Sequence, residues 1–471
     1  MEWLERIQSS RCTVIGLGVS NMPLVELLLR HGATVSVRDQ KSAEQLGDVA
    51  SRLQAAGVKL FLGDSYLDQM DEEILFRSPG VHPHTKEIRD AVSRGAILTS
   101  EMELFLDLTP ARIVGITGSD GKTTTTTLTH LILKEALARR GAGRAFVGGN
   151  IGAPLLPHVF EMTEQDVAVI ELSSFQLYTM DRSCDRAAIT NLSPNHLNWH
   201  TDMEDYCNAK KNIYQHSHNQ MAVFNAENEV TRALALAHTG RVTLFSSVKT
   251  SVEDFEGLLK AGDCAVYVRD GVIRYWNGDA EKDYFDTEEI LLPGRHNLEN
   301  YLTAIALTAD LASVEDVRAV ARTFRGVEHR LEYVRTVDGV SYYNSSIDSS
   351  PTRTAAALSA LAQKPIVICG GYDKHIPFAP LAEALCARAK AVVLTGATAE
   401  KIKAALDEVG CTVKVVKESD FTEAVHCARA LAREGDVVLL SPACASFDAF
   451  PNFAARGEFF KSLVRQFQEK E

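Results

Sequence analysis

The sequence predicts an α/β protein of three domains: a Rossmann-like N-terminal domain, a central P-loop ATPase-type domain and a Rossmann-like C-terminal domain. Apolar segments of strand length alternate with amphipathic helical segments from end to end, which is typical of mostly parallel sheets. The 471 residues are too many for one hydrophobic core, and three segments each open with a strand and a turn. We expect domains at residues 1–99, 100–325 and 326–471.

The first segment begins like a nucleotide-binding β-α-β unit. A strand at residues 12–15 leads into Gly16 and Gly18, and a second strand, at residues 33–39, ends in Asp39. An acid at that place can meet a ribose hydroxyl. Because Asn21 stands where the dinucleotide pattern has its third glycine, the segment favours some nucleotide and argues against a dehydrogenase. A Rossmann-like fold without a ligand here remains an alternative.

The second segment carries a phosphate-binding pattern. Residues 115–124 read Gly-Ile-Thr-Gly-Ser-Asp-Gly-Lys-Thr-Thr and lie between an apolar strand and a helical pattern. Such a turn lets backbone N–H groups converge on an anion at the helix N-terminus. Lys122 could then reach the β- and γ-phosphates, and the Thr123 hydroxyl could hold Mg²⁺. Ile116 replaces the first glycine of the strict pattern, and a glycine-rich turn with a solvated lysine is the alternative.

Polar side chains follow two more strands of this segment. The strand at residues 167–171 ends in Glu171, where a P-loop enzyme places a Mg²⁺ ligand, although a solvated acid would look the same. The strand at residues 187–191 runs into a loop with His196 and His200, which suits metal or phosphate contact or a purely structural role. On pattern alone, Lys210 in the helix after this loop belongs to a solvated face.

The third segment begins near Gly326. It shows strands at residues 341–344, 365–369, 391–394 and 436–440.

Composition excludes several classes of function. The formal net charge of −13 argues against a nucleic-acid binder, which needs a basic face. No run reaches the roughly 18 apolar residues of a membrane span, and the first residues lack the basic start and apolar stretch of a signal peptide. The nine cysteines show no C-x-x-C pair, which indicates reduced thiols and no zinc cluster. We expect a cytoplasmic protein without membrane insertion.

Further motifs point to a known family. They include Ser-Pro-Gly at 78–80, Gly-Gly-Asn-Ile-Gly at 148–152, Glu-Leu-Ser-Ser-Phe-Gln-Leu at 171–177, Gly-Arg-His-Asn-Leu-Glu-Asn at 294–300, His-Arg-Leu-Glu at 329–332, Gly-Gly-Tyr-Asp-Lys at 370–374 and Ser-Pro-Ala-Cys-Ala-Ser at 441–446. With them the chain resembles, over nearly its whole length, the Mur ligases, ATP-dependent enzymes that form amide bonds in peptidoglycan synthesis. It is most similar to the members that join D-glutamate to UDP-N-acetylmuramoyl-L-alanine.

The resemblance implies a reaction through an acyl phosphate, with ATP, two Mg²⁺ ions and small-molecule substrates. We expect a monomeric chain. It also implies that Lys210 is carbamylated, which would replace the ammonium charge by two oxygens suited to a hard cation. The implied catalytic residues are Lys122, Glu171, His196 and Lys210, and the implied metal ligands are Thr123, Glu171, His196 and Lys210. The implied ATP contacts are Gly118, Asp120, Gly121, Lys122, Thr123, Thr124, Asn297, Asn300 and Arg330. The implied contacts with the UDP-linked substrate and with D-glutamate are Gly18, Val19, Ser20, Asp39, Gly80, Asn150, Ser173, Lys374, Ser446 and Phe453.

Some positions depart from the family pattern. Ser345 stands where an aspartate is usual, and Asp348 is the nearest acid that could compensate for it in contacting ATP. The alternative is a solvated Asp348, with a weaker neutral hydrogen bond from Ser345. Asn195 and Asn198 replace common aspartates near His196. These changes leave the implied core residues in place but affect the surroundings of the metal and the nucleotide.

Three other readings remain. A sister ligase, either another Mur enzyme or one like folylpolyglutamate synthase, would differ in the third domain, where Lys374 and Ser446 favour D-glutamate. A nicotinamide-dependent oxidoreductase is disfavoured by the phosphate loop. A non-catalytic nucleotide-binding protein would be expected to lack Lys122, Glu171 or His196, and all three are present.

Overall fold

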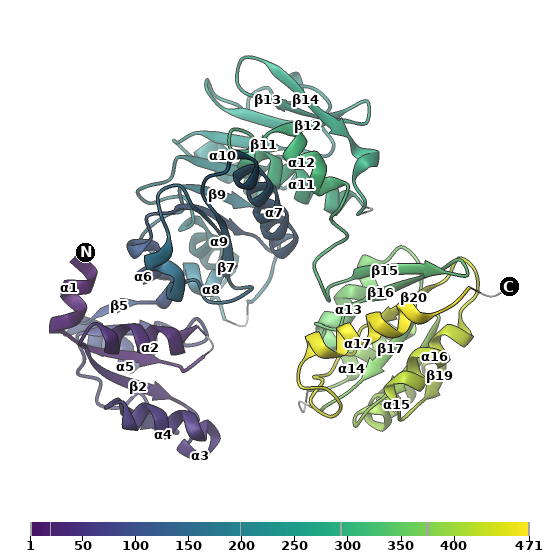
Figure 1. The fold of residues 1–471 in the computed structure, drawn as a ribbon, viewed down its shortest axis with the longest axis horizontal. Helices are drawn as coiled ribbons and strands as arrows, with labels where there is room; N and C mark the ends of the chain where they lie inside the picture. Colours follow the sequence, from purple (N-terminus) through teal and green to yellow (C-terminus); the bar gives the residue numbers. More distant parts are fainter. Residues whose placement is uncertain (1, 19, 198, 293, 374–375, 470–471) are drawn as a thin grey trace. The chain divides into compact units, whose positions relative to one another are not determined.

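The computed structural model describes residues 2–18, 20–197, 199–292, 294–373 and 376–469. Within them the chain forms three sheets (Figure 1), and its contacts group into two units, Met1–Phe324 and Arg325–Glu471. The mostly parallel α/β class predicted from the sequence is confirmed. The boundaries after residues 99 and 325 stay predictions.

The first sheet is parallel throughout, in the order β3-β2-β1-β4-β5. Its strands are β1 (Arg11–Ile15), β2 (Thr34–Asp39), β3 (Lys59–Leu62), β4 (Ile74–Arg77) and β5 (Ile97–Thr99), and the helices around it are α1 (Glu2–Ser9), α2 (Asn21–Arg30), α3 (Ala43–Leu46), α4 (Asp48–Ala55) and α5 (Lys86–Ser93). Since Ile15 of β1 pairs with Arg38 on one side and with Arg77 on the other, these two arginines flank the start of the first turn.

The second sheet has the order β14-β13-β12-β11-β10-β9-β6-β8-β7. Its strands are β6 (Arg112–Thr117), β7 (Ala145–Gly149), β8 (Val167–Glu171), β9 (Arg186–Ile189), β10 (Met221–Asn225), β11 (Val242–Phe245), β12 (Cys264–Arg269), β13 (Val272–Trp276) and β14 (Glu281–Asp286). The helices are α6 (Glu101–Leu108), α7 (Lys122–Arg140), α8 (Ser174–Leu177), α9 (Met203–Lys211), α10 (Glu229–Ala237), α11 (Arg295–Thr308) and α12 (Val314–Ala321), with short 3₁₀ turns η1 (Leu156–Glu161), η2 (Glu253–Phe255) and η3 (Thr287–Glu289). The antiparallel edge formed by β12, β13 and β14 was not predicted.

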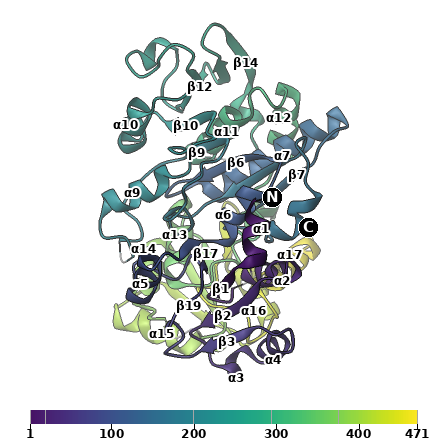
Figure 2. The same ribbon diagram turned by 90° about the vertical axis from the view of Figure 1, so that its left-hand side faces the viewer.

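The first two sheets share one hydrophobic core. Buried side chains of α2, α6 and η1 belong to the same cluster as those of β1 and β6. Figure 2 shows α6 between the N-terminal strands and the central sheet. The helix begins there because the Ser100 hydroxyl accepts a hydrogen bond from the Glu103 N–H at 3.2 Å. The turn after β1 and the turn after β6 are therefore held by one packed interior.

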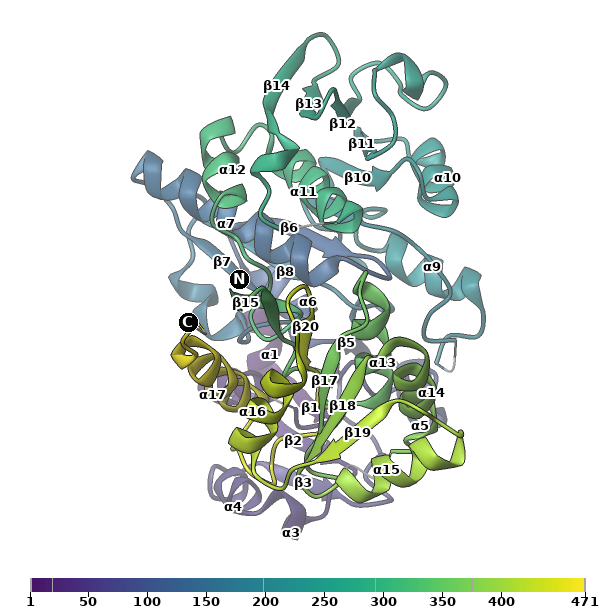
Figure 3. The ribbon, with the colours of Figure 1, turned by 90° about the vertical axis from the view of Figure 1, so that its right-hand side faces the viewer.

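The third sheet belongs to the second unit and has the order β15-β16-β20-β17-β18-β19, with only β15 antiparallel. Its elements are β15 (Glu332–Val337), β16 (Val340–Asn344), α13 (Pro351–Ala360), β17 (Ile366–Gly370), α14 (Ala379–Arg388), β18 (Ala391–Thr395), α15 (Ala399–Glu408), β19 (Lys414–Lys417), α16 (Phe421–Leu431), β20 (Val437–Leu440) and α17 (Phe453–Gln466). Along β17, Ile366 and Ile368 join one buried cluster with α16 and α17, and Val367 and Cys369 join another with α13, α14 and α15. Figure 3 shows these two helix layers on opposite faces.

None of the described helices combines the length and the apolar composition that a membrane crossing needs.

Candidate active site

The phosphate loop follows β6 and ends where α7 begins at Lys122. Gly118 and Gly121 adopt positive φ angles of 149° and 78°. A Cβ atom at Gly118 would lie 1.9 Å from the Thr190 hydroxyl, and one at Gly121 would lie 2.4 Å from the Asn300 side-chain oxygen. Both positions therefore require glycine, for backbone conformation and for space.

The loop is fastened to the end of the neighbouring strand β9. The N–H of Ser119 donates to the Asn191 carbonyl at 2.9 Å, and the N–H of Asp120 donates to the Asn191 side-chain oxygen at 2.9 Å. The Lys122 ammonium folds over the loop and donates to the carbonyls of Gly118 and Ser119 at 3.0 and 2.9 Å. Thr123 and Thr124 lie in the first turn of α7. Asn191 was not predicted as a site residue, because its role depends on a contact between distant segments.

Glu171 lies at the end of β8, directly beside Ile116 of β6. Its side chain is 1% exposed. One carboxylate oxygen accepts from the Asn150 amide at 2.8 Å, while the other is buried and has no hydrogen-bond partner among the described residues. A buried, unpartnered carboxylate oxygen is costly unless a cation or donor meets it, so this position suits a hard cation such as Mg²⁺.

Lys210 of α9 is buried against the same loop. Its amine donates to the Thr117 hydroxyl at 2.9 Å and to the Gly118 carbonyl at 3.0 Å. Burial, and then the nearby Lys122 ammonium, lower the pKa of Lys210 well below its usual value. The interpretation of Lys210 as part of a solvated face is therefore wrong.

The loop after β9 carries the two histidines in different settings. His196 has a φ of 55° and its exposed ring lies 4.9 Å from the Phe175 ring, centroid to centroid. Partial desolvation of this otherwise exposed ring, followed by the charges of Lys122 and Lys210, lowers the pKa of His196 and favours the neutral imidazole that metals bind. His200 is buried and held by the Ser174 hydroxyl at 2.9 Å and the Asp205 carboxylate at 3.1 Å, which is a structural arrangement.

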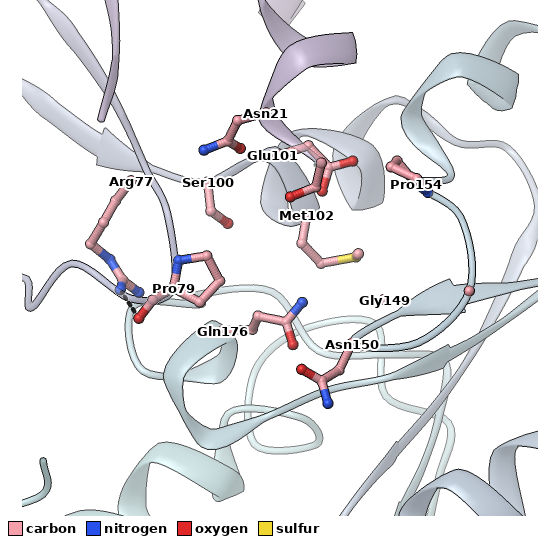
Figure 4. A pocket seen from close by; sticks show the side chains of 12 residues that line it. Asn21, Arg77, Pro79, Ser100, Glu101, Met102, Gly149, Asn150, Pro154 and Gln176 are labelled. Atoms are coloured by element: carbon pink, nitrogen blue, oxygen red, sulfur yellow. Dashed lines mark hydrogen bonds between the residues drawn. The ribbon is translucent and has the colours of Figure 1, made fainter. Parts of the chain in front are cut away.

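A cavity of about 300 Å³ lies beside this site (Figure 4). N-terminal residues that line it include Ser20, Asn21, Arg77 and Pro79, and central residues include Glu101, Asn150 and Gln176. Asn150 donates to Glu171, so one side chain joins the cavity wall to the end of β8. Among the predicted substrate residues, Ser20 and Asn150 line the cavity. Gly80 follows the lining residue Pro79, Gly18 and Ser173 are not among the lining residues, and Val19 falls outside the described residues.

Asp39 is fully engaged in holding the first turn. Its carboxylate accepts from the N–H of Leu17 at 2.6 Å and from that of Lys41 at 2.8 Å, and the residue is 7% exposed. Its predicted place near the substrate nucleoside stays a prediction.

One predicted ATP contact, Asn300, lies at the phosphate loop. Asn300 of α11 accepts from the Thr125 hydroxyl at 3.2 Å and is 6% exposed, and its amide lies 3.5 Å from the Asn297 oxygen. Arg330 belongs to the second unit.

In the second unit, Ser446 is buried and Phe453 is 39% exposed at the start of α17, while Lys374 and, in the first unit, Asn198 fall outside the described residues. Asp348 is 6% exposed and accepts from the Ser441 hydroxyl at 2.8 Å. The alternative of a solvated Asp348 is therefore wrong, and burial raises its pKa. Whether Asp348 replaces the acid missing at Ser345 stays a prediction.

One group of described residues in this unit could hold a metal ion by spacing alone. The ligand atoms of Glu328, His329 and Glu458 lie within 4.8 Å of one another. The Lys461 ammonium, however, lies 2.8 Å from the Glu328 carboxylate and 2.7 Å from that of Glu458. This cation already pairs with both carboxylates of the cluster.

Known proteins resemble this chain both in sequence and in fold. The sequence models of a MurD-like N-terminal domain, a Mur ligase middle domain and a Mur ligase glutamate ligase domain match residues 10–100, 116–308 and 329–444. The UDP-N-acetylmuramoylalanine–D-glutamate ligases of Clostridium novyi and Clostridium perfringens are 45% and 44% identical over 469 residues, 98% of each chain.

Solved structures show the same fold at low identity. The UDP-N-acetylmuramate-alanine ligase of Thermotoga maritima matches with a TM-score of 0.51 and 19% identity, covering 97% of this chain and 99% of its own. MurF from Acinetobacter baumannii matches with a TM-score of 0.53 and 15% identity, covering 83% and 90%.

Proposed function

The chain belongs to the Mur ligase family, and we propose that it adds D-glutamate to UDP-N-acetylmuramoyl-L-alanine at the site built around its phosphate loop. It is an ATP-dependent ligase that forms an amide bond in the synthesis of peptidoglycan precursors. The observation that carries the proposal is the Asn150–Glu171 pair, which joins a substrate-sized cavity to the phosphate loop. This arrangement would bring the carboxylate of the first substrate close to the γ-phosphate.

The chemistry balances in two steps. The substrate carboxylate attacks the γ-phosphorus of ATP, the bond to the ADP oxygen breaks, and an acyl phosphate forms. The amine of D-glutamate then attacks the acyl carbon, inorganic phosphate leaves and the nitrogen loses a proton. Lys122, on the phosphate loop, would offset the charge that builds on the transferred phosphoryl oxygens.

We also propose two Mg²⁺ positions. Thr123 and Glu171 would hold one ion, since the second Glu171 oxygen is buried without a hydrogen-bond partner among the described residues, and His196 with carbamylated Lys210 would hold the other. Bound Mg²⁺ would neutralise phosphoryl charge and orient the oxygens.

Carbamylation of Lys210 is supported by its burial beside Lys122, because a neutral amine can attack carbon dioxide and release a proton to give the carbamate. Replacing Lys210 by alanine should nearly abolish activity, and added formate or acetate should restore part of it by supplying the lost oxygens. An intact-mass measurement that finds no carbon dioxide adduct, together with no rescue, would contradict this assignment.

For ATP we propose contacts from Gly118, Asp120, Gly121, Thr124, Asn297, Asn300 and Arg330. For the UDP substrate we propose Gly18, Val19, Ser20, Asp39, Gly80, Asn150 and Ser173. We also propose the three domains at 1–99, 100–325 and 326–471, a monomeric state and a cytoplasmic location.

In the C-terminal domain, Lys374, Ser446 and Phe453 would bind D-glutamate, with the Lys374 cation meeting one carboxylate. The matched test is Lys374→Ala, which should raise the KM for D-glutamate much more than the KM for ATP. Equal activity with D-glutamate and L-lysine would contradict selection by charge.

One assay tests the function directly. Phosphate release from ATP is measured with UDP-N-acetylmuramoyl-L-alanine and each candidate amino acid in turn. We expect release with D-glutamate and little with L-lysine or D-alanine. Release with another amino acid alone would assign the chain to a sister ligase, and no release with any of them would contradict an enzymatic function.

A further inference from the structure

Arg77, at the end of β4, is one of the most deeply buried charged side chains of the protein, at 1% exposure. It lines the cavity, yet no carboxylate lies within ion-pair distance among the described residues. Burial lowers its pKa to about 10. Because burying a cation without an anion is costly, its retention calls for a role beyond filling space.

The guanidinium instead collects hydrogen bonds from two separate segments. One terminal nitrogen donates to the carbonyls of Ser78, Pro79 and Val81, at 3.3, 3.4 and 2.8 Å. The other donates to the Phe175 carbonyl at 2.8 Å and to the Thr179 hydroxyl at 3.3 Å. Figure 4 shows Arg77 and Pro79 together on one side of the cavity. Arg77 thus ties the loop at residues 78–81, which borders the cavity, to the segment around α8.

That segment supports the loop that carries His196. The Phe175 ring lies 4.9 Å from the His196 ring and 4.8 Å from the Trp199 ring, centroid to centroid. The Ser174 hydroxyl bonds His200 at 2.9 Å. His82, directly after the cavity loop, also reaches Trp199, because the two ring centroids lie 4.4 Å apart. Both routes converge on His196, Trp199 and His200.

The histidine loop needs such support, since His196 holds a positive φ of 55°, a conformation that non-glycine residues keep only when their surroundings fix it. A small shift of Phe175 or Trp199 would therefore move the His196 imidazole. Displacements of this size can change a rate by orders of magnitude when the group has to meet a metal or a reacting atom.

We infer that Arg77 is a positioning residue that couples occupation of the cavity by the UDP substrate to the placement of the His196 loop. The inference rests on the proposed function, because it takes the cavity as the substrate site and His196 as a ligand. It adds a route by which the filled cavity prepares the phosphate-transfer site, and it makes the Ser78–Val81 loop part of that preparation.

The sheet itself provides a matched control. Arg38 of β2 pairs with Ile15 on the opposite side from Arg77 and is also fully buried. Its bonds go to the Glu72 carboxylate and to carbonyls at Tyr66 and Asp68, all within the N-terminal domain. Arg38→Lys should cost stability much as Arg77→Lys does, without touching the route to His196.

The reporter is Trp199, isolated by Trp3→Phe and Trp276→Phe, since the chain has three tryptophans. In this background, titration with UDP-N-acetylmuramoyl-L-alanine should shift Trp199 emission. Arg77→Lys keeps the charge but loses the planar fork, so the shift should be largely lost and kcat should fall by roughly ten- to a hundredfold. The KM for ATP should change little, and the Mg²⁺ concentration for half-maximal rate should rise. Arg38→Lys should leave all four readouts unchanged while lowering the melting temperature.

The inference is overturned if Arg77→Lys behaves like Arg38→Lys, with lower stability but an intact Trp199 shift and unchanged kcat. If Arg77→Lys does not fold, Thr179→Val, which removes one acceptor of the guanidinium, decides the question by the same readouts with a smaller effect. Failure of the proposed function looks different: the wild-type protein would then release no phosphate in response to D-glutamate.

Discussion

Two strand-turn-helix units of the first folded unit share a plan but differ in what their acids do. The turn between β1 and α2 and the turn between β6 and α7 each lie beside a parallel strand that ends in an acid, Asp39 on β2 and Glu171 on β8. Both carboxylate oxygens of Asp39 accept hydrogen bonds, from the backbone N–H groups of Leu17 and Lys41. One oxygen of Glu171 accepts from the Asn150 amide, and the other is buried without a partner among the described residues.

Both oxygens of the acid beside the first turn, between β1 and α2, are satisfied within the protein. The second turn, between β6 and α7, has an oxygen beside it that is unsatisfied among the described residues and that a ligand could meet. At the first turn the Asn21 amide also closes back onto the Gly16 carbonyl at 2.6 Å. Every acidic oxygen there has a donor, so the turn offers a fixed wall to a substrate. At the second turn, the buried Lys210 amine and the Lys122 ammonium both bond the loop, and a buried oxygen of Glu171 has no hydrogen-bond partner among the described residues. Such an oxygen is unfavourable until a cation or a donor meets it.

The largest effect that we expect at the second turn is the loss of turnover when Lys122 is replaced. We expect Lys122→Ala to lower kcat by about 10²–10³ or more, because an ammonium that meets developing phosphoryl charge is lost. The measurement is D-glutamate-dependent phosphate release. The matched control is Lys41→Ala beside the first turn, whose exposed side chain touches none of the proposed site, and which should keep normal rates. Near-normal release by Lys122→Ala would show that the second turn is as complete as the first.

The free oxygen of Glu171 gives the next largest effect. Glu171→Gln keeps the shape and can still accept from Asn150, but it removes the charge that would hold Mg²⁺. We expect kcat to fall by roughly a hundredfold at fixed Mg²⁺ and to recover partly at higher Mg²⁺. Stability without Mg²⁺ should stay the same or rise, since an uncompensated buried charge is gone. A variant with unchanged Mg²⁺ dependence would mean that this oxygen meets no cation.

Local pattern predicted the two turns well, because each is built from residues close in sequence. The strand at residues 167–171 and the helix after Gly121 lie where the sequence predicted them. The burial of Lys210 under Gly118 was invisible to pattern, since the two are 92 positions apart, and only family resemblance pointed to it. Arg77 was missed for the same reason: its partner Phe175 is 98 positions away, and an arginine ending a strand usually signals exposure.

Replacing Asp39 tests the structural role that we assign to the acid beside the first turn. Asp39→Asn leaves one acceptor for two backbone donors, so an N–H group of Leu17 or Lys41 loses its partner. We expect the free energy of unfolding to fall by about 1–3 kcal/mol and the KM for the UDP substrate to rise, with a smaller effect on kcat than that of Glu171→Gln. Denaturant unfolding and steady-state kinetics measure the two quantities. A variant that loses kcat but keeps its stability would show that Asp39 acts in chemistry, as Glu171 is proposed to do.

Glu101, on the cavity wall, is a third buried acid. It has neither the two backbone donors of Asp39 nor the cation proposed for Glu171. Its carboxylate accepts a hydrogen bond from the backbone N–H of Leu156, one of its oxygens has no partner among the described residues, and burial raises its pKa to about 7. A raised carboxyl pKa means that the folded state binds the proton more tightly than the unfolded one. Stability from this group is therefore present below about pH 4.5 and is lost as the pH rises towards 7.

Glu101→Gln removes that titration while keeping the volume and an acceptor for Leu156. We expect the variant and the wild type to unfold with similar free energies at pH 4.5 and the variant to be more stable by about 1–3 kcal/mol at pH 8. Glu103, whose pKa is also raised to about 7, is present in both proteins and cancels in the difference. Unfolding curves at the two pH values decide the matter. If the difference in free energy of unfolding between the variant and the wild type is the same at both pH values, Glu101 is charged in the folded protein. A buried acid could then remain ionised here without the donors of Asp39 or the cation proposed for Glu171.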